Sequence, residues 1–283
     1  MDFPPLTLLK KYGQPLDELK EIFTVYYNRY RAMGYSDPET LNKVGESGIY
    51  QAMALSKWGQ TKQVYSFSKE FVDTLMTAPL DVPFEKSIFE RLPFSCFCVK
   101  IDDFYGLVDF DNEFIKGGYV GLFPFIKEGI GGFTYQFPYD EVWDGTPNQT
   151  IEEGFKCMTI AEEQKRLTRI MFQVVLYLSC SNAVIEENPK QKKIYRPPFS
   201  EPKNRYSEVR IWDCGIRYTK ETVKQITEDI HIIRGTHKSP RPHWRRGHWH
   251  LYRVGKGRKE TKLNWVAPSF VGKGDTPVIV REK

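Results

Sequence analysis

The five histidines of the chain lie within twenty consecutive residues, between His231 and His250. The same stretch contains two tryptophans, and the wider segment 231–263 holds ten Lys/Arg residues against a single acid, Glu260. Because cationic side chains bind phosphate oxygens and flat rings stack on bases, this composition predicts a nucleic-acid-binding surface. The candidate binding residues are Arg241, His243, Trp244, Arg245, Arg246, His248, His250 and Arg253.

Two other chemistries are compatible with these histidines. In a strand, His248 and His250 project from the same face, and His243 is near enough in sequence to complete a zinc site. No carboxylate accompanies them between 231 and 253, while several arginines do, so we predict no metal and no other cofactor. A pair of imidazoles can also cleave RNA without a metal, one as base and one as acid. The sequence assigns no catalytic residue, and this alternative stays open.

A purely structural interpretation is also available. In a strand over HWHLYRV, Trp249 and Leu251 would face the core while His248, His250 and Tyr252 would cover the other side. The two interpretations are compatible, and we expect a structural strand with a functional basic face. Trp265 in LNWVAPSFV is expected in the core. We interpret a further group of acids as turn residues rather than magnesium ligands, namely Asp102, Asp103, Asp109 and Asp111.

The composition limits the class of protein. At 283 residues with 40% hydrophobic residues, the chain can bury one large core or two modest ones. The longest apolar run, IMFQVVLYL at 170–178, is interrupted by Gln173 and is far shorter than the roughly 20 residues of a membrane span. The start of the chain lacks the pattern of a signal peptide. We therefore expect a cytoplasmic protein with no membrane partner, and cysteines that are reduced and mostly buried.

The order of elements predicts an α+β fold. Residues 1–90 read as a mainly helical N-terminal region, with helices over 16–33, from Asp37, and after Ser68. Residues 91–283 read as a mixed, mostly antiparallel β core packed on one long helix within 159–183. A proline-rich exposed loop follows at 186–206. The basic C-terminal segment 231–263 contains the first strand, HWHLYRV, and the loop, GKGRKET, of a β-hairpin whose second strand is LNWVAPSFV.

Three stretches resemble a known group of proteins. SPRPHWRRGHWHLYRVGKGR followed by LNWVAPSFVG is similar to the ending of a family encoded by phages and plasmids, which includes the type V-A anti-CRISPR that lowers the level of its target effector nuclease. LPFSCFCVKI at 92–101 resembles the group's Leu-Pro-aromatic-x-Cys strand, and VRIWDCGIRY at 209–218 resembles its Trp-Asp-x-Gly strand. The resemblance extends over 65–283.

The resemblance implies an anti-CRISPR regulator that recognises the nascent N-terminal peptide of a CRISPR effector nuclease and causes loss of the encoding mRNA. The partners it implies are that peptide together with the ribosome or the mRNA. It carries over no catalytic residue. The alternatives from the residues themselves are a histidine- or metal-dependent ribonuclease, or a basic RNA-binding module.

Overall fold

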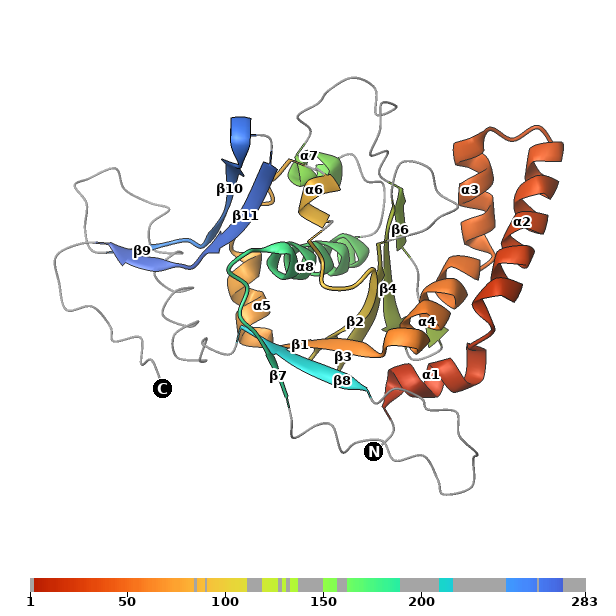
Figure 1. Cartoon of the computed structure of the whole chain (residues 1–283), viewed down its shortest axis with the longest axis horizontal. Coiled ribbons are helices and arrows are strands. Elements are labelled where there is room, and N and C mark those ends of the chain that lie inside the picture. The colour runs from red at the N-terminus through yellow and green to blue at the C-terminus, as the bar shows by residue number, and fades with distance from the viewer. Residues whose placement is uncertain are drawn as a thin grey trace. The chain divides into compact units, whose positions relative to one another are not determined.

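The computed structural model has an α+β fold, as predicted (Figure 1). It describes residues 3–83, 86–89, 91–110, 119–126, 129–130, 133–136, 150–156, 162–188, 209–215, 243–258 and 260–271. The chain divides into two compact units, each assembled from separate segments. The first unit comprises 1–66, 94–143 and 187–212, and the second comprises 67–93, 144–186 and 213–283. No helix among the described residues is long and apolar enough to cross a membrane.

Four helices begin the first unit. They are α1 (Pro4–Tyr12), α2 (Leu16–Ala32), α3 (Asp37–Glu46) and α4 (Ile49–Thr61). The predicted helix over 16–33 is confirmed as α2, which buries Leu19 and Phe23 at a four-residue spacing. The predicted start at Asp37 is also confirmed: the Glu39 carboxylate accepts hydrogen bonds from the Ser36 N–H at 2.9 Å and the Ser36 hydroxyl at 2.7 Å, which closes the first turn.

The sheet of the first unit runs in the hydrogen-bonded order β5-β4-β3-β2-β1-β8, and β6 also pairs with β4. Its strands are β1 (Gln63–Phe67), β2 (Cys96–Ile101), β3 (Phe104–Asp109), β4 (Tyr119–Ile126), β5 (Gly129–Ile130), β6 (Phe133–Gln136) and β8 (Arg210–Cys214). The predicted antiparallel meander is confirmed by the β2–β3, β3–β4 and β4–β6 pairings. Strand β1 was not predicted, because a run of five residues directly after an apolar helix carries no distinct period.

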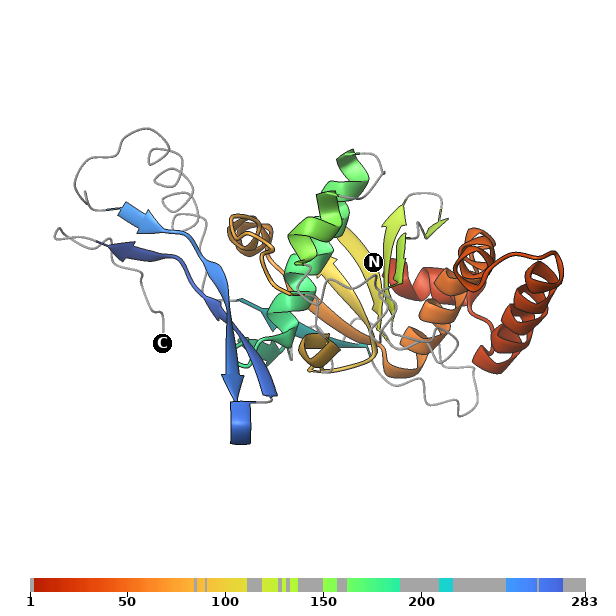
Figure 2. The ribbon, with the colours of Figure 1, turned by 90° about the horizontal axis from the view of Figure 1, so that it is seen from above.

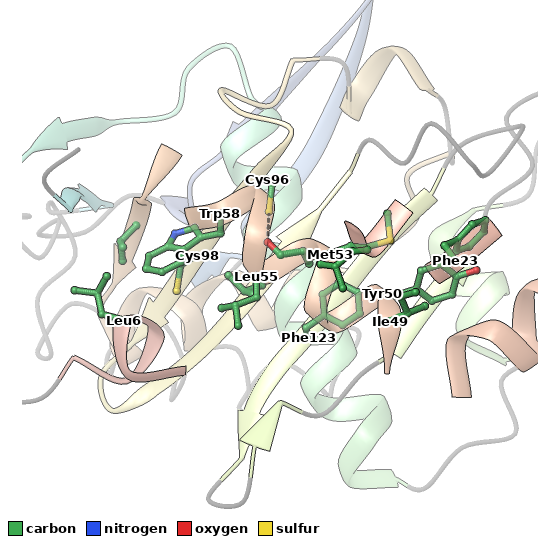
Figure 3. Close-up of a cluster of buried hydrophobic side chains, with 14 of the residues drawn as sticks. Leu6, Phe23, Ile49, Tyr50, Met53, Leu55, Trp58, Cys96, Cys98 and Phe123 are labelled. Atoms are coloured by element: carbon green, nitrogen blue, oxygen red, sulfur yellow. Dashed lines mark hydrogen bonds between the residues drawn. The ribbon is translucent and has the colours of Figure 1, made fainter. Parts of the chain in front are cut away.

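The core of the first unit lies between α4 and the strands of the meander. Figure 3 shows Tyr50, Met53 and Trp58 of α4 among these buried side chains, with the Cys96 thiol donating to the Ala54 carbonyl at 3.2 Å. The Trp58 indole N–H donates to the Gln63 carbonyl at 2.9 Å, so the buried ring has no unsatisfied donor.

The interpretation of Asp109 as a turn residue is wrong. Asp109 is the last residue of β3, its side chain is fully buried, and Lys57 Nζ lies 3.1 Å from its Oδ2. A buried carboxylate requires a charged or hydrogen-bonding partner, and α4 supplies one 52 residues earlier in the chain, which no local pattern reveals. Asp102 and Asp103 do form the turn between β2 and β3, and Asp111 lies outside the described residues.

The second unit contains the predicted long helix. Its elements are α5 (Lys69–Met76), α6 (Lys86–Phe89), α7 (Ile151–Lys156), α8 (Glu162–Ser179), β7 (Ile185–Glu187), β9 (His243–Arg245), β10 (His248–Val254), the 3-10 turn η2 (Lys256–Arg258), β11 (Glu260–Val266) and β12 (Ser269–Val271). Residues 171–180 are buried throughout, as expected for the apolar half of α8. The predicted cap of α5 is also present, since Ser68 Oγ accepts from the Phe71 N–H at 3.2 Å.

The predicted C-terminal hairpin is present, but its second part is two strands rather than one. Strands β10 and β11 are antiparallel and joined through η2, with Gly255 at φ 78° and Gly257 at φ 75°. LNWVAPSFV is interrupted at Ala267 and Pro268, since proline cannot donate to the ladder. Arg246 and Gly247 interrupt the other strand before β10, so β9 pairs with β12. Figure 2 shows the β9–β12 pair continuing the ribbon of the β10–β11 pair.

Candidate nucleic-acid interface

The register of the hairpin sorts its side chains onto two faces. Paired residues of an antiparallel ladder project to the same side, and neighbours along a strand alternate. The inward face carries the pairs Trp249–Trp265, Leu251–Leu263 and Arg253–Thr261. The outward face carries His248–Val266, His250–Asn264, Tyr252–Lys262 and Val254–Glu260.

The inward face is anchored by two tryptophans. Trp265, Leu263 and Thr261 are buried, which confirms the prediction that Trp265 is a core residue. The rings of Trp249 and Trp265 have their centroids 4.7 Å apart, within the range of favourable aromatic pairs. The predicted division of the β10 side chains between two faces is therefore confirmed, with Trp249 on the covered face and His250 exposed on the other.

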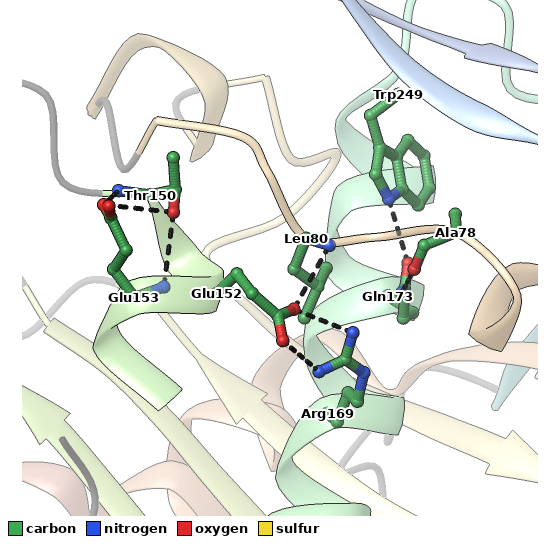
Figure 4. A network of polar contacts seen from close by, with 8 residues as sticks. All are labelled: Ala78, Leu80, Thr150, Glu152, Glu153, Arg169, Gln173 and Trp249. Carbon is green, nitrogen blue, oxygen red and sulfur yellow. Dashed lines mark hydrogen bonds and ion pairs between the residues drawn. The ribbon is translucent and has the colours of Figure 1, made fainter. Parts of the chain in front are cut away.

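A buried amide ties β10 to helix α8. Figure 4 shows the Trp249 indole N–H donating to Gln173 Oε1 at 3.0 Å, while Gln173 Nε2 donates to the Ala78 carbonyl at 2.9 Å. Gln173 is fully buried, so both of its polar atoms require partners in the protein. Nearby, Arg169 Nη2 lies 2.8 Å from Glu152 Oε2, which joins α8 to α7.

The outer edge of β11 is occupied by the turn that follows α8. The Ser181 N–H donates to the Leu263 carbonyl at 3.0 Å. The side-chain amide of Asn182 donates to the Trp265 carbonyl at 2.8 Å and accepts from the Trp265 N–H at 3.0 Å. The Ser181 hydroxyl also donates to Asn264 Oδ1. These bonds imitate a neighbouring strand, so the turn fixes the position of β11 and satisfies its edge.

Gly247, between β9 and β10, lets the backbone pass close to the ring of Trp265. A Cβ at this position would lie 2.4 Å from Cη2 and 2.5 Å from Cζ2 of Trp265. Since no side chain fits at such distances, the glycine between Arg246 and His248 is required for the packing of Trp265.

The outward face presents a row of rings. The ring centroids of His248 and His250 are 6.4 Å apart, and those of His250 and Tyr252 are 4.0 Å apart. His250 and Tyr252 are exposed, and His248 is half-buried. Lys262 is exposed and lies opposite Tyr252 in the ladder. An accessible row of rings beside a cation can stack on bases and attract phosphate.

The part of the chain that contains the hairpin matches a known protein family. Residues 65–273 match the AcrVA2-like family, described as the anti-CRISPR type V subtype A2 family. This chain belongs to the AcrVA2-like family. A crystal structure of AcrVA2 is similar at 17% sequence identity and a TM-score of 0.46, covering 95% of this chain and 98% of that one. No curated protein sequence matches the chain.

The family match includes the complete hairpin and excludes α1 to α4. Within it, the Trp-Asp-x-Gly stretch of this AcrVA2-like chain has a structural explanation. Gly215 has φ +67°, and a Cβ there would lie 2.1 Å from Phe71 Cδ1, so the position admits only glycine. The indole N–H of Trp212 donates to Gln63 Oε1 at 2.8 Å.

The predicted site residues are not all on one surface. Arg245 and Arg246 are exposed beside the interruption between β9 and β10, while His248 and His250 share the outward face of β10. Arg253 belongs to the inward set, opposite Thr261, and so does not join the histidine row. His243 and Trp244 lie in β9, paired with Val271 and Phe270, but their side chains lie outside the described residues, as does all of Arg241.

The described residues contain no group of three His, Cys, Asp or Glu side chains that could hold a metal ion. His237 and the side chain of His243 lie outside them, so the imidazoles whose geometry the structure describes are those of His248 and His250.

The sequence alone did not identify Lys262 as part of the candidate interface. It also did not identify Asn182, which holds β11 in place. Lys262 becomes relevant only through the register that places it opposite Tyr252. Asn182 follows a helix and has no local pattern, whereas Gln173 was visible as a polar interruption of an apolar run.

Proposed function

We propose that this AcrVA2-like protein is an anti-CRISPR regulator that acts in the host cytoplasm during translation. It recognises the nascent N-terminal peptide of a type V effector nuclease, and the encoding mRNA is lost. The C-terminal hairpin contacts RNA, either the message itself or the ribosome. Membership of the anti-CRISPR type V subtype A2 family supports the regulatory part of this proposal.

The observation that carries the RNA contact is the asymmetry of the hairpin. One face is held by Trp249, Trp265 and the Gln173 amide, and the opposite face exposes His250, Tyr252 and Lys262. Residues 243–271 contain seven Lys/Arg against the single acid Glu260. Among the residues that the structure describes, no ion pair involves Arg245, Arg246 or Lys262. Cations that are not matched by carboxylates attract a polyanion.

Recoding the opening codons of the target tests the mechanism. If the peptide is recognised, synonymous recoding preserves the loss of effector mRNA, because the encoded side chains are unchanged. A frameshift confined to the same stretch abolishes the loss, although the RNA is nearly identical. The opposite pattern, with sensitivity to recoding and tolerance of the frameshift, contradicts peptide recognition and indicates that the RNA sequence itself is read.

A metal-free ribonuclease is the second candidate, favoured by the two imidazoles of His248 and His250 on one accessible face, 6.4 Å apart. One imidazole would take the proton of the attacking hydroxyl and the other would protonate the leaving oxygen. Cleavage of purified RNA by purified protein, abolished in both His248→Ala and His250→Ala, would establish this candidate and remove the non-enzymatic regulator.

A further inference from the structure

We propose that the outward face of β10 and β11 binds a single-stranded segment of RNA, with bases stacked on His250 and Tyr252 and the backbone held by Lys262. This inference rests on the proposed function, in which the hairpin contacts RNA. It adds which form of RNA is bound and which side chains bind it.

The spacing of the rings fits unpaired bases. Side chains two residues apart on a strand recur at about 6.6 Å, which is close to twice the rise of about 3.4 Å between stacked bases. The 6.4 Å between His248 and His250 therefore leaves about the thickness of one base between the two rings. Their planes are tilted by 41°, and the terminal ring torsion of a histidine is soft, so a bound base can reorient the exposed His250 ring. Tyr252 and His250, 4.0 Å apart, extend the same surface along the strand.

Cationic side chains surround this row of rings. Lys262 is the ladder partner of Tyr252, and Arg245 and Arg246 are exposed at the other end of β10. Lys256 and Arg258 are exposed at the tip of the hairpin. The single acid is displaced from the row, because the Glu260 carboxylate lies over the Gly255 turn, where Oε1 would be 2.8 Å from a Cβ on that glycine. A nucleic-acid backbone along the hairpin thus meets positive charge beside Tyr252 and at both ends of the row.

Duplex RNA does not fit this surface. The bases of an A-form helix are stacked inside the duplex, and its deep, narrow major groove excludes side chains. Rings on a flat strand reach base faces only where bases are unpaired. Protein surfaces that combine a cationic track with successive aromatic rings bind single strands with little sequence preference.

The site is also independent of the packing that holds the hairpin. The anchoring contacts of Trp249 and Trp265 are on the opposite face, so substitution of exposed rings on the outward face leaves the core intact. Tyr252 is 38% exposed, and Tyr12 in α1 offers a matched control at 41% exposed, beside Lys11 and outside the hairpin.

The test measures binding of a labelled twelve-nucleotide uridine RNA to the full chain by fluorescence anisotropy, over a range of salt concentrations. Removing both rings in His250→Ala/Tyr252→Ala should weaken binding by on the order of 10-fold or more, because each stacked base contributes substantially to affinity. The slope of log affinity against log salt should not change, since the rings contact no phosphate. Lys262→Ala should lower that slope by about 0.7.

Three controls accompany these variants. Tyr252→Phe keeps the ring and should bind like the wild type, and Tyr12→Ala should also bind like the wild type. A blunt duplex of matched length should bind more weakly than the single strand. Thermal unfolding of each variant shows whether the fold is retained.

Equal binding of the single strand by His250→Ala/Tyr252→Ala and the wild type, or tighter binding of the duplex, overturns the inference. So does a wild-type protein that binds neither RNA. The proposed function is judged separately by codon recoding in cells, so peptide-dependent loss of mRNA together with absent RNA binding rejects the stacking surface alone.

Discussion

Trp249 of the hairpin donates its indole N–H to Gln173 Oε1 of helix α8 at 3.0 Å, and the same amide donates to the Ala78 carbonyl at 2.9 Å. These two hydrogen bonds explain why a glutamine interrupts the most apolar run of the chain. They also link β10 directly to α8. The exposed face of β10 is therefore held by a polar interaction on its other side.

Replacing Gln173 with methionine should destabilise the protein by about 1 to 3 kcal/mol, because the buried Ala78 carbonyl and the Trp249 donor would have no partner. Urea unfolding measures the change. Trp249→Phe removes the donor, so the double variant should be destabilised by less than the sum of the two single effects. Full additivity of the two effects would show that the hydrogen bond contributes no stability. Gln14→Met, at an exposed glutamine, should change stability by less than about 0.5 kcal/mol.

Gly247→Ala should destabilise the protein by about 1 to 3 kcal/mol, because the new methyl group overlaps the Trp265 ring. The two ring atoms it meets, Cη2 and Cζ2, are absent from phenylalanine. In a Trp265→Phe background the same glycine substitution should therefore cost clearly less. The comparison is made by denaturant unfolding of the four proteins, and an equal cost in both backgrounds would contradict the overlap.

Local patterns in the sequence predicted helices α2, α3, α5 and α8 and the meander, because their periods extend over several residues. The break at Pro268 and the short strand β1 could not be predicted in the same way. At Pro268 the ladder is interrupted and the pairing changes from β10 to β9. In β1, four of the five residues are buried and resemble the end of a helix. Each unit is assembled from three separate segments of the chain. Contacts between segments that are distant in sequence decide this division, and local patterns do not reveal them.

The candidate site was partly visible in the sequence. Alternation along HWHLYRV placed His248 and His250 together and Trp249 on the other side, as the structure shows. Arg253 was grouped with them from composition, although alternation places it opposite. Lys262 could not be assigned to the site before the length and geometry of the η2 turn had set the register.

The buried pair of Lys57 and Asp109 should be far more important for stability than a surface pair. Lys57→Met leaves a fully buried carboxylate without this partner and should cost about 3 kcal/mol. Lys43→Met removes a pair with Glu46 of similar length, 3.0 Å, but at the surface, where solvent screens the charges, so it should cost far less. Adding Asp109→Asn to Lys57→Met should recover part of the stability. Comparable costs for the two lysines would contradict a structural role for the buried pair.

The buried cysteines should make the folded state less stable at high pH. Burial raises the thiol pKa values of Cys96, Cys98, Cys180 and Cys214, so the folded chain keeps these protons while the unfolded chain releases them above about pH 8.5. Stability from a raised pKa is complete below the unfolded value and decreases as pH rises through it. The unfolding free energy should therefore fall between about pH 8 and about pH 10, and less steeply in Cys98→Ala. An unchanged pH dependence in that variant would show that Cys98 ionises normally when folded.

Arg245 and Arg246 should set the salt dependence of RNA binding, since both are exposed beside the first histidine of the row. Replacing both with alanine should lower the slope of log affinity against log salt by about 0.7 for each phosphate that is no longer bound. The replacement of Lys10 and Lys11, an adjacent exposed pair in α1, removes the same net charge outside the hairpin and should leave the slope near its wild-type value. In cells, the Arg245→Ala/Arg246→Ala variant should be produced normally but should lower the effector mRNA less than the wild type does. If both pairs reduced the slope equally, net charge rather than local binding of phosphate would account for the affinity, and the hairpin could not be assigned as the RNA interface.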